Sequence, residues 1–112
     1  MDINKLKSVG INYDSGLARF AGKKELYEKY LNKFVDDQSF NDLNKYLEAN
    51  DIENAFKAAH TLKGIVGNLS MDNLYNATCL LVEDLRVGKT DNLDTLFSPV
   101  KDEYEKVLNV LK

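Results

Sequence analysis

Apolar residues recur at intervals of three and four along most of the chain, which is the spacing of one face of an α-helix. No stretch alternates apolar and polar residues long enough to predict a convincing β-strand. Short polar or glycine-containing breaks separate the amphipathic segments. The pattern therefore predicts an all-α fold, an antiparallel four-helix bundle with short additional N-terminal helices. The longer helices are expected at about 23–38, 40–49, 50–69, 72–87 and within 92–112.

The N-terminal part of the chain predicts two short helices. Apolar residues within 1–12 are compatible with one short helix that ends at Gly10. Asp14-Ser15 then provides side chains that can cap a second helix over 16–20. These elements precede the first long amphipathic segment.

Capping patterns also predict where the later helices begin. Asn50 followed by Glu53 fits a capping box, so the central helix is expected to start at Asn50. Gly88 fits the end of the next helix. Ser98-Pro99 fits an N-cap with a first-turn proline, so the last segment is expected to contain a short helix, a break or kink, and a longer helix.

Length and composition narrow the class of protein. With 112 residues, the chain is expected to form a single domain over 1–112. A net charge of −3 argues against a broad nucleic-acid surface, and no apolar run is long enough to cross a membrane. Cys79 is the sole cysteine, which excludes an internal disulfide, suits the cytoplasm and favours a small core residue over a reactive thiol. Residues 1–5 lack the apolar stretch of a signal peptide, and a single domain that starts at Met1 suggests a free-standing protein.

His60 is the only histidine of the chain, and its neighbours are unusual. Lys63 and Gly64 lie three and four positions later, on the same helical face, and Gly67 lies two turns beyond His60. A glycine inside a helix costs about 1 kcal/mol relative to alanine, so two of them beside one histidine suggest that a large partner needs access. His60 lies about 120° around the helix from the middle of its apolar face. We therefore expect the ring beside the core rather than in it.

The chemistry available at His60 suits phosphoryl transfer. A neutral imidazole offers a lone pair and histidine forms covalent intermediates. Lys63 could neutralise phosphoryl oxygens, and Lys57 could add positive potential. The alternative explanation is an ordinary surface histidine, with glycines that serve close helix packing. No second histidine or cysteine is present to form a common zinc site, so no metal and no cofactor are expected on this chain.

The segment AAHTLKG at 58–64 resembles the signature of the histidine-containing phosphotransfer (HPt) domains of phosphorelays. GLARF at 16–20, the following ELY at 25–27 and Asn50-Asp51 also resemble the family, so the likeness covers about 10–112.

The resemblance implies that His60 carries the phosphoryl group, Lys63 steadies it and Gly64 lets a receiver domain dock. It implies a stoichiometric carrier without ATP-dependent kinase activity, in keeping with the absence of a glycine-rich nucleotide loop. The implied partners are response-regulator receiver domains and a hybrid sensor kinase, with Mg²⁺ only on the receiver. A cytoplasmic monomer is expected, with Gly67 and Lys57 as further docking residues.

Two positions depart from the family pattern. Ser70 stands where a glycine is frequent, so the turn between the central helices is expected to differ. Val82, with Glu83 next to it, stands where a polar residue often supports the imidazole, and Glu83 receives no assigned role. This departure leaves open a scaffold that docks a receiver without accepting phosphate. A helical bundle with an unrelated partner is a third possibility, and a metal-dependent enzyme is the least favoured.

Overall fold

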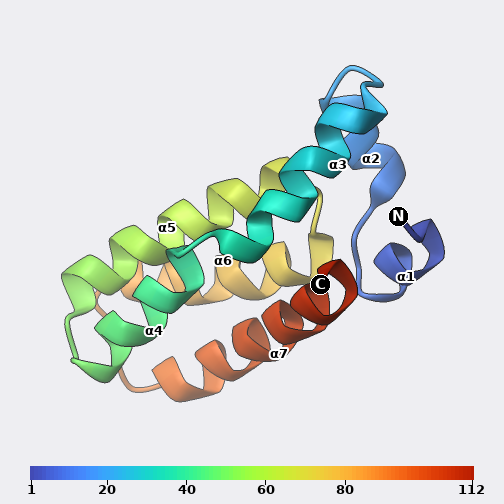
Figure 1. Ribbon diagram of the computed structural model, residues 1–112. Coiled ribbons are helices and arrows are strands. Elements are labelled where there is room, and N and C mark those ends of the chain that lie inside the picture. The colour runs from blue at the N-terminus through green and yellow to red at the C-terminus, as the bar shows by residue number, and fades with distance from the viewer.

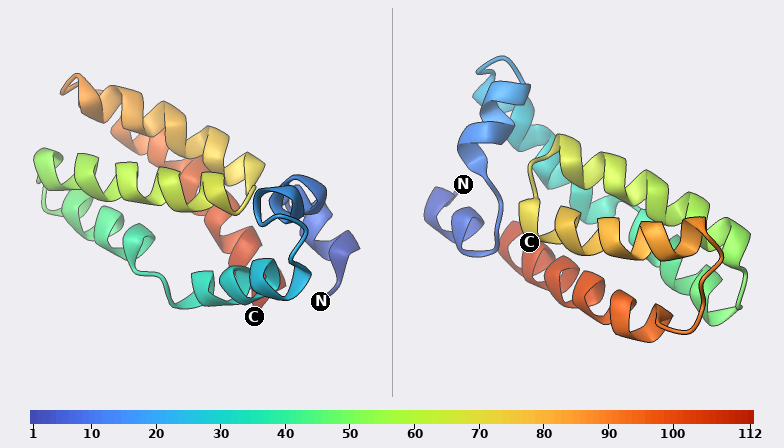
Figure 2. Two further views of the ribbon diagram at one scale, coloured as in Figure 1. Left: turned by 90° about the horizontal axis from the view of Figure 1, so that it is seen from above. Right: turned by 180° about the vertical axis from the view of Figure 1, so that it is seen from behind.

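The computed structural model describes residues 1–112 and is helical throughout, without a β-sheet (Figure 1). The bundle helices α4 to α7 pack in chain order, each against the next, as an antiparallel set. Figure 2 shows that α3 and α4 follow one another along the same side of α5. The predicted all-α bundle with short N-terminal helices is confirmed. The elements are α1 (Ile3–Ser8), α2 (Tyr13–Arg19), α3 (Lys24–Lys33), the 3₁₀ turn η1 (Phe34–Asp36), α4 (Ser39–Glu48), α5 (Ile52–Asn68), α6 (Asp72–Arg86) and α7 (Leu93–Leu111).

One continuous apolar core joins all the helices. The predicted buried face of α5 forms its centre, since Ala55, Ala59, Leu62 and Val66 are fully buried. Burial of such side chains is the dominant favourable term in folding and holds the bundle in register. Side chains on the opposite face of α5 are therefore exposed to solvent.

Two helix starts differ from the capping predictions. Asp51, not Asn50, caps α5, with its carboxylate 3.2 Å from the backbone nitrogen of Asn54. Asn50 has a φ of 54° and ends α4, because asparagine tolerates the left-handed conformation that such an end requires. The prediction for the second short helix is also wrong by a few residues, since Asn12 caps α2 through the backbone nitrogen of Ser15.

The predicted break near Pro99 is absent. Helix α7 runs from Leu93 to Leu111 with Pro99 inside it. A proline in a helix deprives the carbonyl four residues earlier of its usual donor, here the carbonyl of Thr95. Thr95 and Pro99 are both exposed, so water can satisfy this carbonyl. Buried Val100, Tyr104 and Val107 meanwhile anchor the helix to the core.

The N-terminal helices are fastened to the turn between α5 and α6. Ile11 forms an isolated antiparallel bridge with Met71. The backbone nitrogen of Asn12 donates to the Ser70 carbonyl at 2.8 Å, and that of Asp72 donates to the Gly10 carbonyl at 2.9 Å. As a result, α2 has a fixed position beside the C-terminal end of α5.

Two buried tyrosines strengthen this attachment. The Tyr27 hydroxyl of α3 donates to the Leu69 carbonyl at the end of α5, at 2.7 Å, and is inaccessible to solvent. The Tyr13 hydroxyl donates to Glu28 at 2.6 Å, and the two tyrosine rings are in contact. Burial and then the hydrogen bond to Glu28 raise the pKa of Tyr13 to about 12. Burial also raises the pKa of Tyr27.

These shifts predict a loss of stability in alkali. A tyrosine in the unfolded chain has a pKa of about 10. The folded state therefore binds more protons than the unfolded state from about pH 10 to about pH 12, and the free energy of unfolding falls as the pH rises through this window. Tyr27→Phe removes one of the two tyrosines with a raised pKa, so the free energy of unfolding should fall less steeply with pH. Urea unfolding at several pH values measures this slope. The same variant should lose about 1–2 kcal/mol at pH 7, since the Leu69 carbonyl loses its buried partner. An unchanged alkaline slope would contradict the assignment.

Candidate functional site

His60 lies in the middle of α5 on the side turned away from the core. Its neighbours Ala59 and Leu62 are fully buried, whereas His60 is exposed. The Phe56 ring lies one turn earlier, with ring centroids 6.0 Å apart and planes tilted by 49°. This contact supports one side of the imidazole and leaves the remainder open to a partner. The predicted position beside the core is confirmed.

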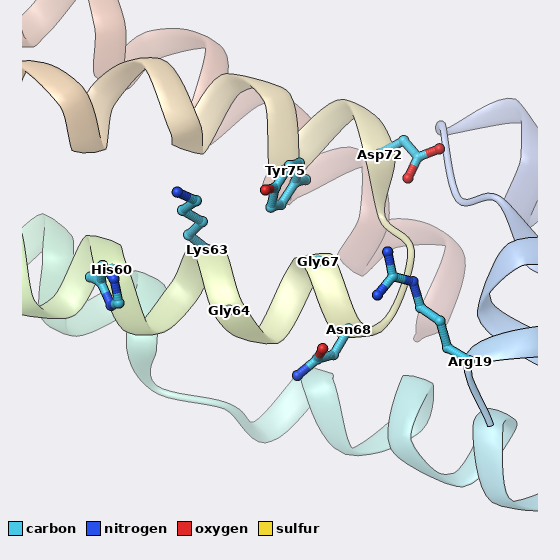
Figure 3. Close-up of a pocket in the computed structure, with 8 residues that line it drawn as sticks. All are labelled: Arg19, His60, Lys63, Gly64, Gly67, Asn68, Asp72 and Tyr75. Carbon is cyan, nitrogen blue, oxygen red and sulfur yellow. The ribbon is translucent and has the colours of Figure 1, made fainter.

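A surface hollow of about 360 Å³ opens along α5 beside the imidazole. Figure 3 shows His60 at one end of the hollow and Arg19 with Asp72 at the other. Between these ends the floor is formed by α5 and one wall by Tyr75 of α6. The lining residues are Arg19, His60, Lys63, Gly64, Gly67, Asn68, Asp72 and Tyr75. With two cations and one carboxylate, this lining is positive although the whole chain carries −3.

Lys63 and Gly64 occupy the positions expected from the sequence. Both line the hollow together with His60. Lys63 takes part in none of the ion pairs of the structure, so its ammonium group is available to an anionic ligand. A Cβ atom added to Gly64 would have no neighbour within 4 Å. The backbone at Gly64 is therefore open to an approaching molecule.

Gly67 and Lys57 differ from these two residues. A Cβ atom at Gly67 would lie 3.0 Å from the ring of Tyr75, so this glycine allows close packing of α5 against α6. The expectation of open backbone at Gly67 is wrong, although the residue does line the hollow. Lys57 lies outside the hollow and pairs with Glu53 at 3.7 Å. Glu53 lies four positions before Lys57 on the same helix, so helical spacing could have indicated that pair. The neighbour of Gly67 is Tyr75 on α6, which spacing within α5 cannot reveal.

Val82 of α6 gives the imidazole no polar support, because its side chain is apolar and fully buried in the core. Glu83 is exposed and pairs with Arg86 at 3.6 Å. The Arg86 guanidinium also lies over the Phe56 ring, 5.5 Å from its centroid. Neither Val82 nor Glu83 lines the hollow beside the imidazole.

Ser70 shows how the turn after α5 forms without glycine at this position. Its φ of 56° is left-handed, a conformation that glycine adopts freely and serine does not. The backbone nitrogen of Ser70 donates to Gly67 and that of Met71 to Val66, which closes the end of α5. The Ser70 hydroxyl also lies 3.2 Å from that of Ser15 in α2. These contacts hold the serine in its strained conformation.

Arg19, Asn68, Asp72 and Tyr75 are lining residues that sequence reasoning missed. Asn68 lies eight positions after His60, so helical spacing alone could have indicated it. Interaction with the Cys79 thiol raises the pKa of Tyr75, while the positive charge of nearby Arg19 opposes that shift.

Cys79 itself is only partly buried and is absent from the core cluster, so the prediction of a core cysteine is wrong.

No three potential metal-binding side chains gather at one place. None of the helices has both the length and the apolar character needed to cross a membrane.

Comparison with protein families gives a match over most of the chain. The family model of the Hpt domain matches residues 26–110. No curated protein and no solved structure matches the chain significantly. The match begins within α3, ends within α7 and includes the whole of α5 with His60, Lys63 and Gly64. On this match, in a helical bundle with an exposed histidine beside open backbone, the chain belongs to the Hpt domain family.

Proposed function

We propose that this protein accepts a phosphoryl group on His60 from an aspartate of one receiver domain and passes it to another. Hpt domains are phosphocarrier modules of two-component phosphorelays and interact with receiver domains and kinases. The observation that carries the proposal for this chain is the exposed His60 beside Lys63 and the open backbone of Gly64, all in one hollow. Under this proposal the chain is a stoichiometric phosphoryl carrier, with His60 as the acceptor, and has no ATP-dependent kinase activity.

The transfer exchanges one bond to phosphorus for another. A ring nitrogen of neutral His60 attacks the phosphorus of an aspartyl phosphate with its lone pair. A P–N bond forms, the P–O bond to the aspartate breaks, and the electron pair leaves with the carboxylate. The second imidazole nitrogen keeps its proton until solvent removes it. Return to a second receiver reverses these steps, with imidazole as the leaving group.

The residues of the hollow assist by position and charge. Phosphoryl transfer depends mainly on alignment and on stabilisation of charge at the equatorial oxygens. Lys63, one turn from His60 and without an ion-pair partner, can place its ammonium group against those oxygens. We further propose that Mg²⁺ is contributed by the receiver, which leaves this chain without a metal or cofactor of its own. A helix that presents both groups on one face aligns them before the partner arrives.

The direct test is phosphate transfer from a receiver domain labelled with ³²P. The wild-type chain should gain label that is lost in acid and retained in base, the behaviour of a phosphoramidate. Mass spectrometry of tryptic fragments should locate the label on the peptide that contains His60. A chain that never gains label from any receiver of its own genome would refute the proposal.

A second candidate is a scaffold that docks receivers without accepting phosphate. The buried, apolar Val82 favours it, because this position supplies no hydrogen bond to the imidazole. Equilibrium binding and transfer distinguish the two. Tight binding of a receiver to the wild-type chain and to His60→Ala, with no transfer to either, would select the scaffold.

Gly64→Gln is expected to slow transfer while leaving the fold intact. Glutamine is a better helix former than glycine, so the free energy of unfolding should rise by up to about 1 kcal/mol. Its side chain would nevertheless stand over the open backbone beside His60, and transfer should slow by about tenfold or more through misplacement of the reacting atoms. Stopped-flow or quenched-flow transfer rates measure the effect, and Gly64→Ala should show a smaller one. Wild-type rates for both variants would remove Gly64 from the docking surface.

A further inference from the structure

Arg19 shares the hollow with His60 although it precedes the histidine by 41 positions and lies outside the residues matched by the family model. Helix α2 holds it there. The bridge between Ile11 and Met71 fixes the start of this helix on the turn after α5. The Ser15 hydroxyl, 3.2 Å from that of Ser70, adds a second attachment within α2. Arg19 therefore projects from a braced element.

The guanidinium of Arg19 has no partner within the protein. The side chain is exposed and forms none of the ion pairs of the structure, even though Asp72 lines the same end of the hollow. Arg86 and Lys57, by contrast, are each paired with a glutamate on their own helix. Arg19 and Lys63 are thus the two unpaired cations of the hollow.

Arg19 stands at the opposite end of the hollow from His60. Figure 3 places its guanidinium at the end of the hollow beyond Gly67. At a rise of about 1.5 Å per residue, the seven residues from His60 to Gly67 span about 10 Å. Across such a distance Arg19 can act on the phosphoryl group only through its charge, whereas it can contact a docked partner directly. Direct contact with the partner is therefore the role that its position favours.

A guanidinium group presents a planar fork of donors that matches a carboxylate. The chain carries −3 overall, so a receiver with an acidic face would be repelled except where the local charge is positive. On the basis of the proposed phosphorelay function, we infer that Arg19 is a docking residue that binds an aspartate or glutamate on the receiver surface, at the end of the hollow opposite His60. Arg19 binds and orients the receiver, and Lys63 stabilises the phosphoryl group during transfer.

The test compares wild type, Arg19→Gln, Arg19→Lys and the charge-matched control Lys101→Gln on α7. The probe is the receiver domain of the same genome that transfers phosphate to the wild type most rapidly. Arg19→Gln should raise the receiver concentration at half-maximal rate by about fivefold, change the plateau rate less than twofold, and weaken the salt dependence. Arg19→Lys should recover part of the affinity, and Lys101→Gln should behave as wild type. A further variant, Arg19→Glu, should bind the receiver more weakly than Arg19→Gln, and changing the contacted receiver carboxylate to lysine should restore its affinity.

Three results would overturn the inference. The first is an unchanged half-saturation concentration in Arg19→Gln. The second is a lower plateau with unchanged affinity, which would assign Arg19 to the chemical step. The third is a urea midpoint of unfolding for Arg19→Gln so much lower that loss of folded protein explains the weaker binding, which would make Arg19 structural.

Equilibrium binding separates this inference from the proposed function. If the wild type gains no phosphate, the carrier function fails. Binding of the most tightly bound receiver to wild type and Arg19→Gln still decides the role of Arg19. A loss of about fivefold supports the inference and equal affinity refutes it.

Discussion

A chain with glutamine in place of His60 is expected to accept no phosphoryl group while folding as the wild type does. Glutamine has a comparable length and hydrogen-bonding capacity, but its amide nitrogen is not a nucleophile. His60 is exposed, so the free energy of unfolding should change by less than about 0.5 kcal/mol. No other histidine exists in the chain to replace it. Label transfer from a phosphorylated receiver measures the loss, and urea unfolding verifies the fold.

Two lysine variants provide the matched controls for this loss. Lys63→Ala should still gain phosphate on His60, about tenfold more slowly, because one charge that faces the phosphoryl oxygens is removed. Lys57→Ala should transfer within about twofold of wild type, because Lys57 pairs with Glu53 outside the hollow. Acid-labile label that persists in His60→Gln would show that another residue is the acceptor.

Gly16→Ala is expected to cause the largest loss of stability. A Cβ atom at this position would overlap the ring and hydroxyl of Tyr27. Tyr27 is inaccessible to solvent and its hydroxyl binds the Leu69 carbonyl, so the ring cannot yield without giving up that hydrogen bond. Overpacking together with the lost hydrogen bond should lower the free energy of unfolding by about 3 kcal/mol. Urea unfolding at pH 7 measures this change.

Gly64→Ala is the matched control for this substitution. It makes the same change within a helix, but the new methyl group meets no atom within 4 Å. The better helix propensity of alanine should therefore raise stability by about 1 kcal/mol. Opposite signs for the two variants would confirm that Gly16 is a packing position and Gly64 an open one. Equal effects would contradict the close approach of α2 to Tyr27.

Helical periodicity predicted most of the fold because each apolar stripe is encoded locally. Residues three or four apart share a face, so the buried side of α5 followed from Ala55, Ala59 and Leu62. The same rule placed His60 outside the core and brought Lys63 and Gly64 to its side. Helix ends were predicted less well. Two residues compete at the start of α5, and the backbone conformation assigned Asn50 to the preceding helix and Asp51 to the cap.

Sequence alone thus determined the all-α bundle, the central helix and the cluster of His60, Lys63 and Gly64, since all three depend on spacing within one helix. The tertiary structure determined which residues of other helices lie next to α5. It placed Tyr75 against Gly67, buried Val82, and brought Arg19 to the hollow through contacts between α2 and the turn after α5. These arrangements depend on residues far apart in the chain, and their pairing is settled by packing and backbone hydrogen bonds that no local pattern encodes.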